Sequence, residues 1–230
     1  MGSRQYLQAM GISLWKSRRN LPFAKQPVQQ EEVALDVKEV PQRWEALRQQ
    51  VANCTACQLH ETRTSTVFGV GNLHADWMIV GEAPGADEDR KGEPFVGKAG
   101  QLLNQMLLAI GVSREEVFIA NILKCRPPNN RDPGVAEIAN CASYLVQQIK
   151  LVQPKVILAV GRIAAQNLLD SNETIGRIRG KVHQYEKTAT PLVATYHPAY
   201  LLRSPREKRK AWADLVLARR VLVSACRHDQ

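Results

Sequence analysis

The sequence contains no apolar run long enough to cross a membrane, since a transmembrane helix needs about 20 consecutive apolar residues. Its first 20 residues lack the apolar core of a secretion signal, which predicts a cytoplasmic protein with no membrane partner. No internal repeat and no low-complexity tract interrupts its 230 residues. These absences leave a globular chain, long enough for one α/β domain with a full core plus an extension.

Acidic residues are in the minority, because 31 Lys and Arg stand against 22 Asp and Glu and give a formal net charge of +9. A basic chain is compatible with a polyanion as partner, since Lys and Arg bind phosphates with release of counterions. The alternative is a basic protein without such a partner, and charge alone leaves both interpretations open.

Short apolar runs followed by loop residues predict four β-strands, at Trp77–Val80, Val117–Ile122, Val156–Val160 and Leu192–Tyr196. Segments with helical spacing precede, separate and follow them, at Pro41–Val51, Leu102–Ile110, Val135–Val152, Ile163–Leu169 and Arg206–Val223. This alternation implies a mostly parallel sheet covered on both faces. The stretch Arg177–Tyr185 is expected to add a small antiparallel strand.

The stretch Gly81–Asp89 follows the first predicted strand and is rich in Gly, Pro and carboxylates. Open α/β sheets bind their ligands outside the carboxyl ends of the parallel strands. The sequence therefore predicts a ligand-binding loop at this position, toward which the ends of the other strands converge.

Four of the five cysteines form a set with defined spacing, namely Cys54, Cys57, Cys125 and Cys141. Disulfides are one interpretation, but a cytoplasmic chain disfavours them. A redox Cys-x-x-Cys pair is another, but such a pair normally opens a helix after a strand, whereas Cys54 follows a predicted helix. Four thiolates suit tetrahedral zinc or a four-iron cluster, and the spacing leaves both metals open. Cys226 stands apart and is interpreted as a buried or idle thiol.

Several motifs are more specific than these patterns, and they are Gly81–Asp89, Gly92–Gly100, Asn121–Pro128 and His197–Arg203. Together they resemble family 4 uracil-DNA glycosylases, the iron–sulfur members of that superfamily, and the resemblance extends from Trp44 to Val223. It implies a three-layer α/β/α sandwich with a mostly parallel four-stranded central sheet. It also implies a [4Fe–4S] cluster, and so favours iron over zinc, with the ligands Cys54, Cys57, Cys125 and Cys141.

The resemblance implies a DNA repair enzyme that flips uracil out of DNA and hydrolyses its N-glycosidic bond, leaving an abasic site. Phe95 would stack on the base, Asn121 would read its polar edge and His197 would donate to O2 as charge develops there. Glu82 and Ala83 would also line the uracil pocket. Each of these three residues also has a purely structural interpretation, with Phe95 in the core, Asn121 in a turn or helix cap, and His197 as a structural histidine.

Three carboxylates compete for the role of orienting water or stabilising the sugar cation, and we rank Asp89 and Glu82 ahead of Glu88. Family 1 enzymes carry an Asp where this chain has Ala83, so the sequence does not identify the water-activating group. The alternative is that these acids cap the following helix or face solvent. The predicted catalytic set is Glu82, Asp89 and His197.

A DNA-binding loop is predicted near the C-terminus, with an apolar wedge for the minor groove and an arginine for phosphate, formed by Tyr200, Leu201, Leu202 and Arg203. The alternative places Leu201 and Leu202 on a helix face. A covalent-trapping relative carries an Arg-rich insertion with a His after the Asn strand, whereas Arg126–Pro133 has no His, so ordinary turnover is expected. The predicted partner is uracil-containing DNA, single- or double-stranded, bound by a monomer in the bacterial cytoplasm that is nucleoid-associated when on DNA.

Residues 1–40 are interpreted as an extension with a flexible linker, and residues 41–230 as the glycosylase domain. Leu7–Arg19 resembles the N-terminal segment of the psi subunit of the bacterial DNA polymerase III clamp loader, which implies the clamp loader as a partner through residues 5–19. The alternative is a basic arm that only adds phosphate affinity.

Two other function classes compete with a monofunctional glycosylase. The first is a non-catalytic Fe–S protein on the same fold that binds nucleic acid or senses redox state. The second is a hydrolase of free nucleotides, against which the predicted wedge at Leu201–Leu202 argues. Lyase chemistry needs a nucleophilic lysine, and the predicted pocket loops contain only Lys98 and Lys124.

Overall fold

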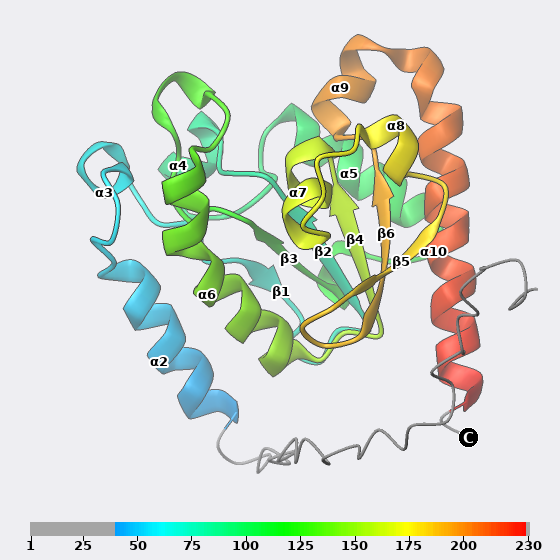
Figure 1. The fold of residues 1–230 in the computed structure, drawn as a ribbon, viewed down its shortest axis with the longest axis horizontal. Helices are drawn as coiled ribbons and strands as arrows, with labels where there is room; N and C mark the ends of the chain where they lie inside the picture. Colours follow the sequence, from blue (N-terminus) through cyan, green and yellow to red (C-terminus); the bar gives the residue numbers. More distant parts are fainter. Residues whose placement is uncertain (1–39, 229–230) are drawn as a thin grey trace, which may run out of the picture. The chain divides into compact units, whose positions relative to one another are not determined.

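The structure, a computed structural model, describes residues 40–228, with side chains up to residue 225. Its centre is a six-stranded sheet with the order β1-β3-β2-β4-β6-β5 (Figure 1). The strands are β1 (Val70–Gly71), β2 (Trp77–Gly81), β3 (Val117–Asn121), β4 (Val156–Val160), β5 (Val182–Tyr185) and β6 (Thr190–Thr195). The four inner strands are parallel, and the two edge strands run antiparallel to their neighbours.

The inner strands form where the apolar runs predicted them, because a parallel sheet covered on both faces buries every residue of its central strands. All residues of β2, β3 and β4 are buried. The small antiparallel strand expected in Arg177–Tyr185 is also present, as β5. The two-residue strand β1 was not predicted, since Val70–Gly71 is too short to show alternation.

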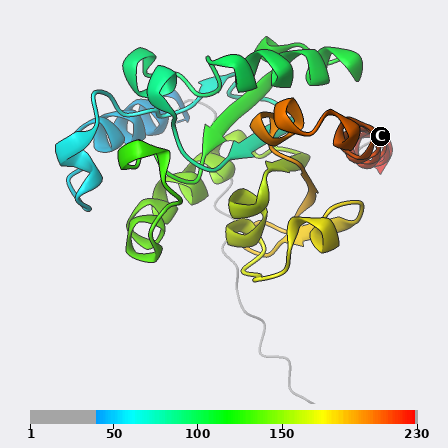
Figure 2. The ribbon, with the colours of Figure 1, turned by 90° about the horizontal axis from the view of Figure 1, so that it is seen from above.

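Helices cover both faces of the sheet (Figures 1 and 2). Alternate residues of β2 reach opposite cores, with Met78 and Val80 in one and Trp77 and Ile79 in the other. The first core also contains α2 (Val40–Ala52), α6 (Val135–Val152), α7 (Arg162–Leu168) and α8 (Ile175–Ile178). The second contains α5 (Lys98–Ala109), α9 (Pro198–Arg203) and α10 (Lys208–His228). The predicted α/β/α sandwich is therefore confirmed.

Short helices were missed where the sequence shows no apolar period. The predicted loop Gly81–Asp89 in fact runs into helix α4 (Ala86–Lys91), whose six residues include five charged ones. Gly92 ends this helix in the left-handed conformation at φ 73°, which glycine adopts without strain. The remaining short elements are α3 (Leu59–Thr62) and the 3₁₀ turns Arg114–Glu116, Pro128–Asn130 and Pro205–Glu207.

The predicted DNA-binding loop is also helical, because Pro198 occupies the first turn of α9, where its fixed φ suits a helix. All four residues of the predicted loop thus lie on a helix, which for Leu201 and Leu202 is what the alternative interpretation held. The predicted clamp-loader segment lies outside the described residues. Among those described, no helix is both long and apolar enough to span a membrane.

Candidate functional site

The site forms where three parallel strands end on the same edge of the sheet. Gly81 at the end of β2 is paired with Asn121 at the end of β3, and His197 follows β6 as the residue before α9. The pairing continues past the strand ends, since the amide of Ile122 donates to the Gly81 carbonyl at 2.9 Å. The sheet therefore brings together residues that the sequence places far apart.

Phe95 packs on this edge in a backbone conformation that few side chains adopt, with φ 54°. Its ring lies so close to Gly81 that a Cβ there would stand 2.7 Å from the ring and 2.4 Å from Oδ1 of Asn121. A Cβ on Gly100 would stand 1.7 Å from the Phe95 carbonyl oxygen. Two glycines thus let the ring lie beside Asn121, as the predicted stacking role requires.

Hydrogen bonds from two distant residues hold the Phe95 segment in this conformation. Oε1 of Glu88 accepts from the amides of Val96 at 2.9 Å and Gly97 at 3.1 Å. The Arg114 guanidinium donates to the Pro94 carbonyl at 2.6 Å and to the Phe95 carbonyl at 3.4 Å. Arg114 was missed from the sequence, because it belongs to no motif and reaches the site only through the fold.

His197 stacks against Phe95, with ring centroids 5.7 Å apart and planes inclined by 29°. Its Nδ1 accepts a hydrogen bond from the Ala199 amide at 3.2 Å, so the proton of the neutral ring is on Nε2. Burial, with a smaller contribution from Arg203, lowers the pKa of His197 to about 4. At neutral pH the ring is therefore an uncharged donor through Nε2–H.

Asn121 carries a buried polar atom without a partner. The residue is 2% exposed, and its Oδ1 accepts no hydrogen bond from any described residue. A buried acceptor left unpaired costs about 1–3 kcal/mol, so proteins retain few of them without a reason. A ligand that offers an N–H group beside Phe95 would satisfy this oxygen.

The three competing carboxylates lie in different environments. Asp89 is buried and accepts from the amides of Thr64 at 3.0 and 3.1 Å and of Ser65 at 3.4 Å. Glu88 holds the Phe95 segment. The Glu82 carboxylate forms no hydrogen bond or ion pair within residues 40–228, and its pKa is raised to about 7, first by burial and then by the charge of Asp132. Glu82 is thus the one of the three whose oxygens are free to act on a ligand.

Arg162 and Asp132 form an ion pair that bears on Glu82, with Nη2 and Oδ2 2.7 Å apart. The charge of Arg162 lowers the pKa of Glu82 and that of Asp132 raises it. Ala83, the next residue, packs instead against the cluster of Leu59, Leu123, Cys125 and Cys141. Of these two neighbouring loop residues, Glu82 is therefore close to the Arg162–Asp132 ion pair and Ala83 to a group of cysteines.

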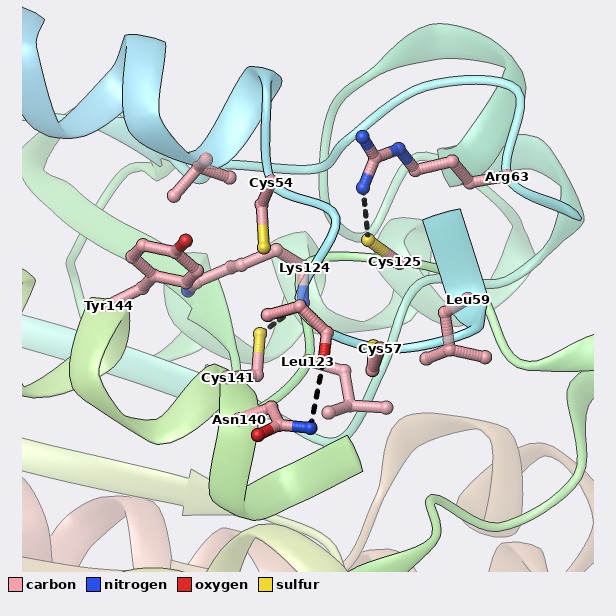
Figure 3. A pocket seen from close by; sticks show the side chains of 12 residues that line it. Cys54, Cys57, Leu59, Arg63, Leu123, Lys124, Cys125, Asn140, Cys141 and Tyr144 are labelled. Atoms are coloured by element: carbon pink, nitrogen blue, oxygen red, sulfur yellow. Dashed lines mark hydrogen bonds between the residues drawn. The ribbon is translucent and has the colours of Figure 1, made fainter. Parts of the chain in front are cut away.

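The four cysteines of the predicted set line one pocket (Figure 3). Cys54 and Cys57 lie between α2 and α3, Cys125 follows β3, and Cys141 is in α6. None of the four forms a disulfide. The sulfur of Cys125 accepts from Arg63 Nη1 at 3.1 Å, that of Cys141 accepts from the Lys124 amide at 3.3 Å, and Tyr144 bonds to Cys54. Four convergent thiols, three of them with a donor directed at the sulfur, fit a thiolate-bound metal centre.

The residues predicted to bind DNA differ in the solvent exposure of their side chains. Leu201 is fully buried in the core beside α5 and α10, so its side chain cannot enter a groove without leaving that core. Tyr200 and Leu202 are exposed by 37% and 45%, and Arg203 is exposed as well. The structure leaves three of the four predicted side chains accessible on α9.

Comparison with known proteins gives a consistent family. A model of the uracil DNA glycosylase superfamily matches residues 68–216. A type-4 uracil-DNA glycosylase of Archaeoglobus fulgidus is 49% identical over 171 residues, which are 72% of this chain and 86% of that protein. One from Thermotoga maritima is 44% identical over 161 residues, 70% of this chain and 83% of that protein. A type-5 enzyme of Pyrobaculum aerophilum is 33% identical over 148 residues, 57% of this chain and 64% of that protein.

Proposed function

Since the chain belongs to the uracil-DNA glycosylase superfamily, we propose that it hydrolyses the N-glycosidic bond of deoxyuridine in DNA and leaves an abasic site. The observation that carries this proposal is the buried, unpartnered Oδ1 of Asn121 beside the Phe95 ring. Uracil flipped out of DNA offers both an aromatic face and an N3–H donor to such a site.

Each residue of the strand edge has a defined task in this proposal. Phe95 stacks on the base, and the Asn121 amide accepts from N3–H and donates to O4 of uracil. Cytosine would meet the same amide with a donor where uracil accepts, and is rejected. Nε2–H of the neutral His197 donates to O2, where negative charge develops as the base departs.

Glu82 is the carboxylate that we assign to the sugar side of the reaction, where it orients water or stabilises the oxocarbenium-like charge. Because its pKa is about 7, its ionised fraction rises through neutral pH. We expect kcat/KM to rise with pH to a plateau above about 7, and Glu82→Gln to lower the plateau by roughly 10²–10⁴-fold and abolish this step. The measurement is the pH profile of uracil release under single-turnover conditions.

A second variant separates Glu82 from other titrating groups. Asp132 raises the pKa of Glu82 by its negative charge, so Asp132→Asn is expected to move the pH midpoint downward while the plateau is retained. An unchanged pH profile in Glu82→Gln would show that another group carries the step and would return Asp89, the other predicted acid, to first place.

The four-cysteine pocket is proposed to hold a [4Fe–4S] cluster, with Cys54, Cys57, Cys125 and Cys141 as ligands. When bound, such a cluster supplies a structural tie between the segment at 54–57, the end of β3 and α6. Four thiolates suit either zinc or a four-iron cluster, and the resemblance to the iron–sulfur uracil-DNA glycosylases is the ground on which we propose the cluster.

Replacing Cys141, a buried ligand of the proposed cluster, tests this assignment. Cys141→Ser should lose iron and visible absorbance, because the thiolate is the ligand. It should also lower Tm by roughly 10 °C, since metal binding contributes folding energy. The control is Cys226→Ser, the cysteine outside the set, which should retain both. A colourless wild-type protein that contains zinc after anaerobic purification would contradict the cluster.

Helix α9 is proposed as the element that enters DNA. Leu202 replaces Leu201 as the apolar wedge because it is the exposed one of the two, and Arg203 is placed next to it for phosphate. We propose a monomer in the cytoplasm that meets uracil in single- or double-stranded DNA.

Strand cleavage after alkali treatment tests the activity itself. Oligonucleotides with one uracil should be cut only after alkali, which reveals an abasic site without lyase activity, and matched thymine strands should stay intact. A protein that binds these strands but leaves them uncut would favour the non-catalytic Fe–S alternative. Hydrolysis of free deoxyuridine would favour the nucleotide hydrolase.

Residues 1–40 are proposed as a separate recruitment segment that binds the clamp loader through residues 5–19 and raises the local enzyme concentration at replication. Its support is the resemblance of Leu7–Arg19 to the psi subunit. Deleting residues 1–40 should abolish binding to purified clamp loader and leave the cleavage of short oligonucleotides unchanged. Equal binding with and without these residues would overturn the segment's role.

A further inference from the structure

A lysine lies fully inside the protein, between the strand-edge site and the cysteine pocket. Lys124 is 1% exposed. Its Nζ donates to the Asn121 carbonyl at 2.9 Å and to Oε1 of Gln148 at 2.6 Å. Both acceptors are uncharged, and no carboxylate within residues 40–228 pairs with it. Burying an ammonium group without a charged partner costs free energy. The burial of Lys124 therefore calls for a structural or functional reason.

The partners of Lys124 are themselves fixed. Gln148 of α6 is fully buried, and its Nε2 donates to the Phe68 carbonyl at 2.8 Å. The Lys124 carbonyl accepts from the Val67 amide at 2.8 Å, and its amide donates to the Cys141 sulfur at 3.3 Å. Lys124 also lines the cysteine pocket (Figure 3). The backbone of Lys124, from which the side chain extends, is therefore held by hydrogen bonds on both sides.

The side chain of Asn121 is oriented through the backbone that carries it, which is paired with Gly81 on one side and bonded to Lys124 on the other. No hydrogen bond within the described residues holds its side-chain amide, and Oδ1 is unpartnered. The direction of the amide thus depends on the backbone at residue 121 and on packing against Gly81 and Phe95. The backbone carbonyl oxygen of Asn121 is the atom that accepts the hydrogen bond from Lys124.

We propose that Lys124 is a positioning residue. Its hydrogen bond to the Asn121 carbonyl fixes the backbone of that residue, so that the side-chain amide of Asn121 faces uracil. This inference rests on the proposed glycosylase function. Lys124 touches no substrate atom and acts through Asn121 alone. Through the hydrogen bond that its backbone amide donates to the Cys141 sulfur, it also ties the orientation of the base-reading residue to the cysteine pocket.

A double-mutant cycle distinguishes positioning from a general structural role. The variants are Lys124→Met, Asn121→Ala and their combination, and the readouts are the single-turnover rate of uracil release and calorimetric binding of free uracil. Lys124→Met should lower the rate roughly 10- to 100-fold, the size expected for a small misplacement of a reacting partner. In the Asn121→Ala background the same change should cost less than about threefold, because no amide remains to be misdirected.

Two controls make the cycle interpretable. Lys150→Met removes an exposed lysine from the same helix as Gln148 and should leave the rate unchanged. In a His197→Ala background, Lys124→Met should retain its full effect, since His197 forms no hydrogen bond with Lys124 or Asn121 in the described part of the chain. Tm and visible absorbance establish that each variant is folded.

Each outcome decides the matter. Equal effects of Lys124→Met with and without Asn121→Ala, or no effect on wild type, would overturn the positioning role. Should Lys124→Met fail to fold, Gln148→Leu takes its place, with a smaller loss expected and the same test of additivity. If wild type releases no uracil, the proposed function fails; if Asn121→Ala is impaired and Lys124→Met is not, only this inference fails.

Discussion

Asn121→Ala is expected to lower kcat/KM for uracil release by about 10²–10³-fold, the cost of losing one well-placed hydrogen-bonding group in a transition state. The loss should fall on binding of free uracil as well, because the amide reads the base before the bond breaks. Stability should respond differently. The variant removes a buried acceptor that no described residue satisfies, so Tm is expected to stay level or rise.

The nature of the contact is tested by Asn121→Asp, which retains the size of the side chain and loses its donor. It should be as impaired as the alanine variant, since O4 of uracil would face an acceptor. Asn72→Ala, which removes an exposed asparagine, is the matched control and should match wild type. An Asn121→Ala enzyme with wild-type kcat/KM would remove Asn121 from the site.

Strands β3 and β6 show why much of this site could be predicted from the sequence. A central parallel strand is apolar along its whole length, so its end is marked by the first polar residue. In this way β3 points to Asn121, whereas the apolar run of β6 ends at Thr195, two residues before the His197-Pro198 pair. Where those ends meet follows from the rule that parallel strands present their carboxyl ends on one edge.

The carboxylates show what the sequence could not supply. Glu82, Glu88 and Asp89 are chemically similar and stand within eight residues of one another. Their tasks are separated by donors that come from elsewhere in the chain, the amides of Thr64 and Ser65 for Asp89 and those of Val96 and Gly97 for Glu88. Such contacts depend on the fold, and no local pattern encodes them. Arg114 was missed for the same reason, as was the burial of Leu201.

The environment of His197 leads to the second large effect. Its Nε2–H is proposed to meet the oxygen on which charge develops, so His197→Ala should lower kcat by about 10²–10³-fold. KM should change far less, because the interaction strengthens only as the base departs. His197→Asn can present an amide donor from a shorter side chain and is expected to recover part of the loss. Rates of uracil release across substrate concentrations measure this split.

The pH dependence of His197 gives an independent check on the neutral ring. A pKa of about 4 in the folded protein means that uracil release should show no step near pH 6.5 from this residue. The step assigned to Glu82 should persist in His197→Asn. A wild-type step near pH 6.5 that His197→Asn abolishes would show that the charged ring takes part.

The lowered pKa of His197 should also make the free energy of unfolding depend on pH, and the direction of that dependence can be stated. Between about pH 6.5 and 4 the unfolded chain binds a proton on His197 that the folded protein does not. The free energy of unfolding therefore falls as the solution is acidified, by an amount on the order of 3 kcal/mol once both states are protonated. His197→Asn removes this part of the acid sensitivity, so its denaturation midpoint should decline less than that of wild type between those pH values. An equal decline in both proteins would mean that the folded protein binds this proton as readily as the unfolded chain, so that the ring is charged only below about pH 6.5.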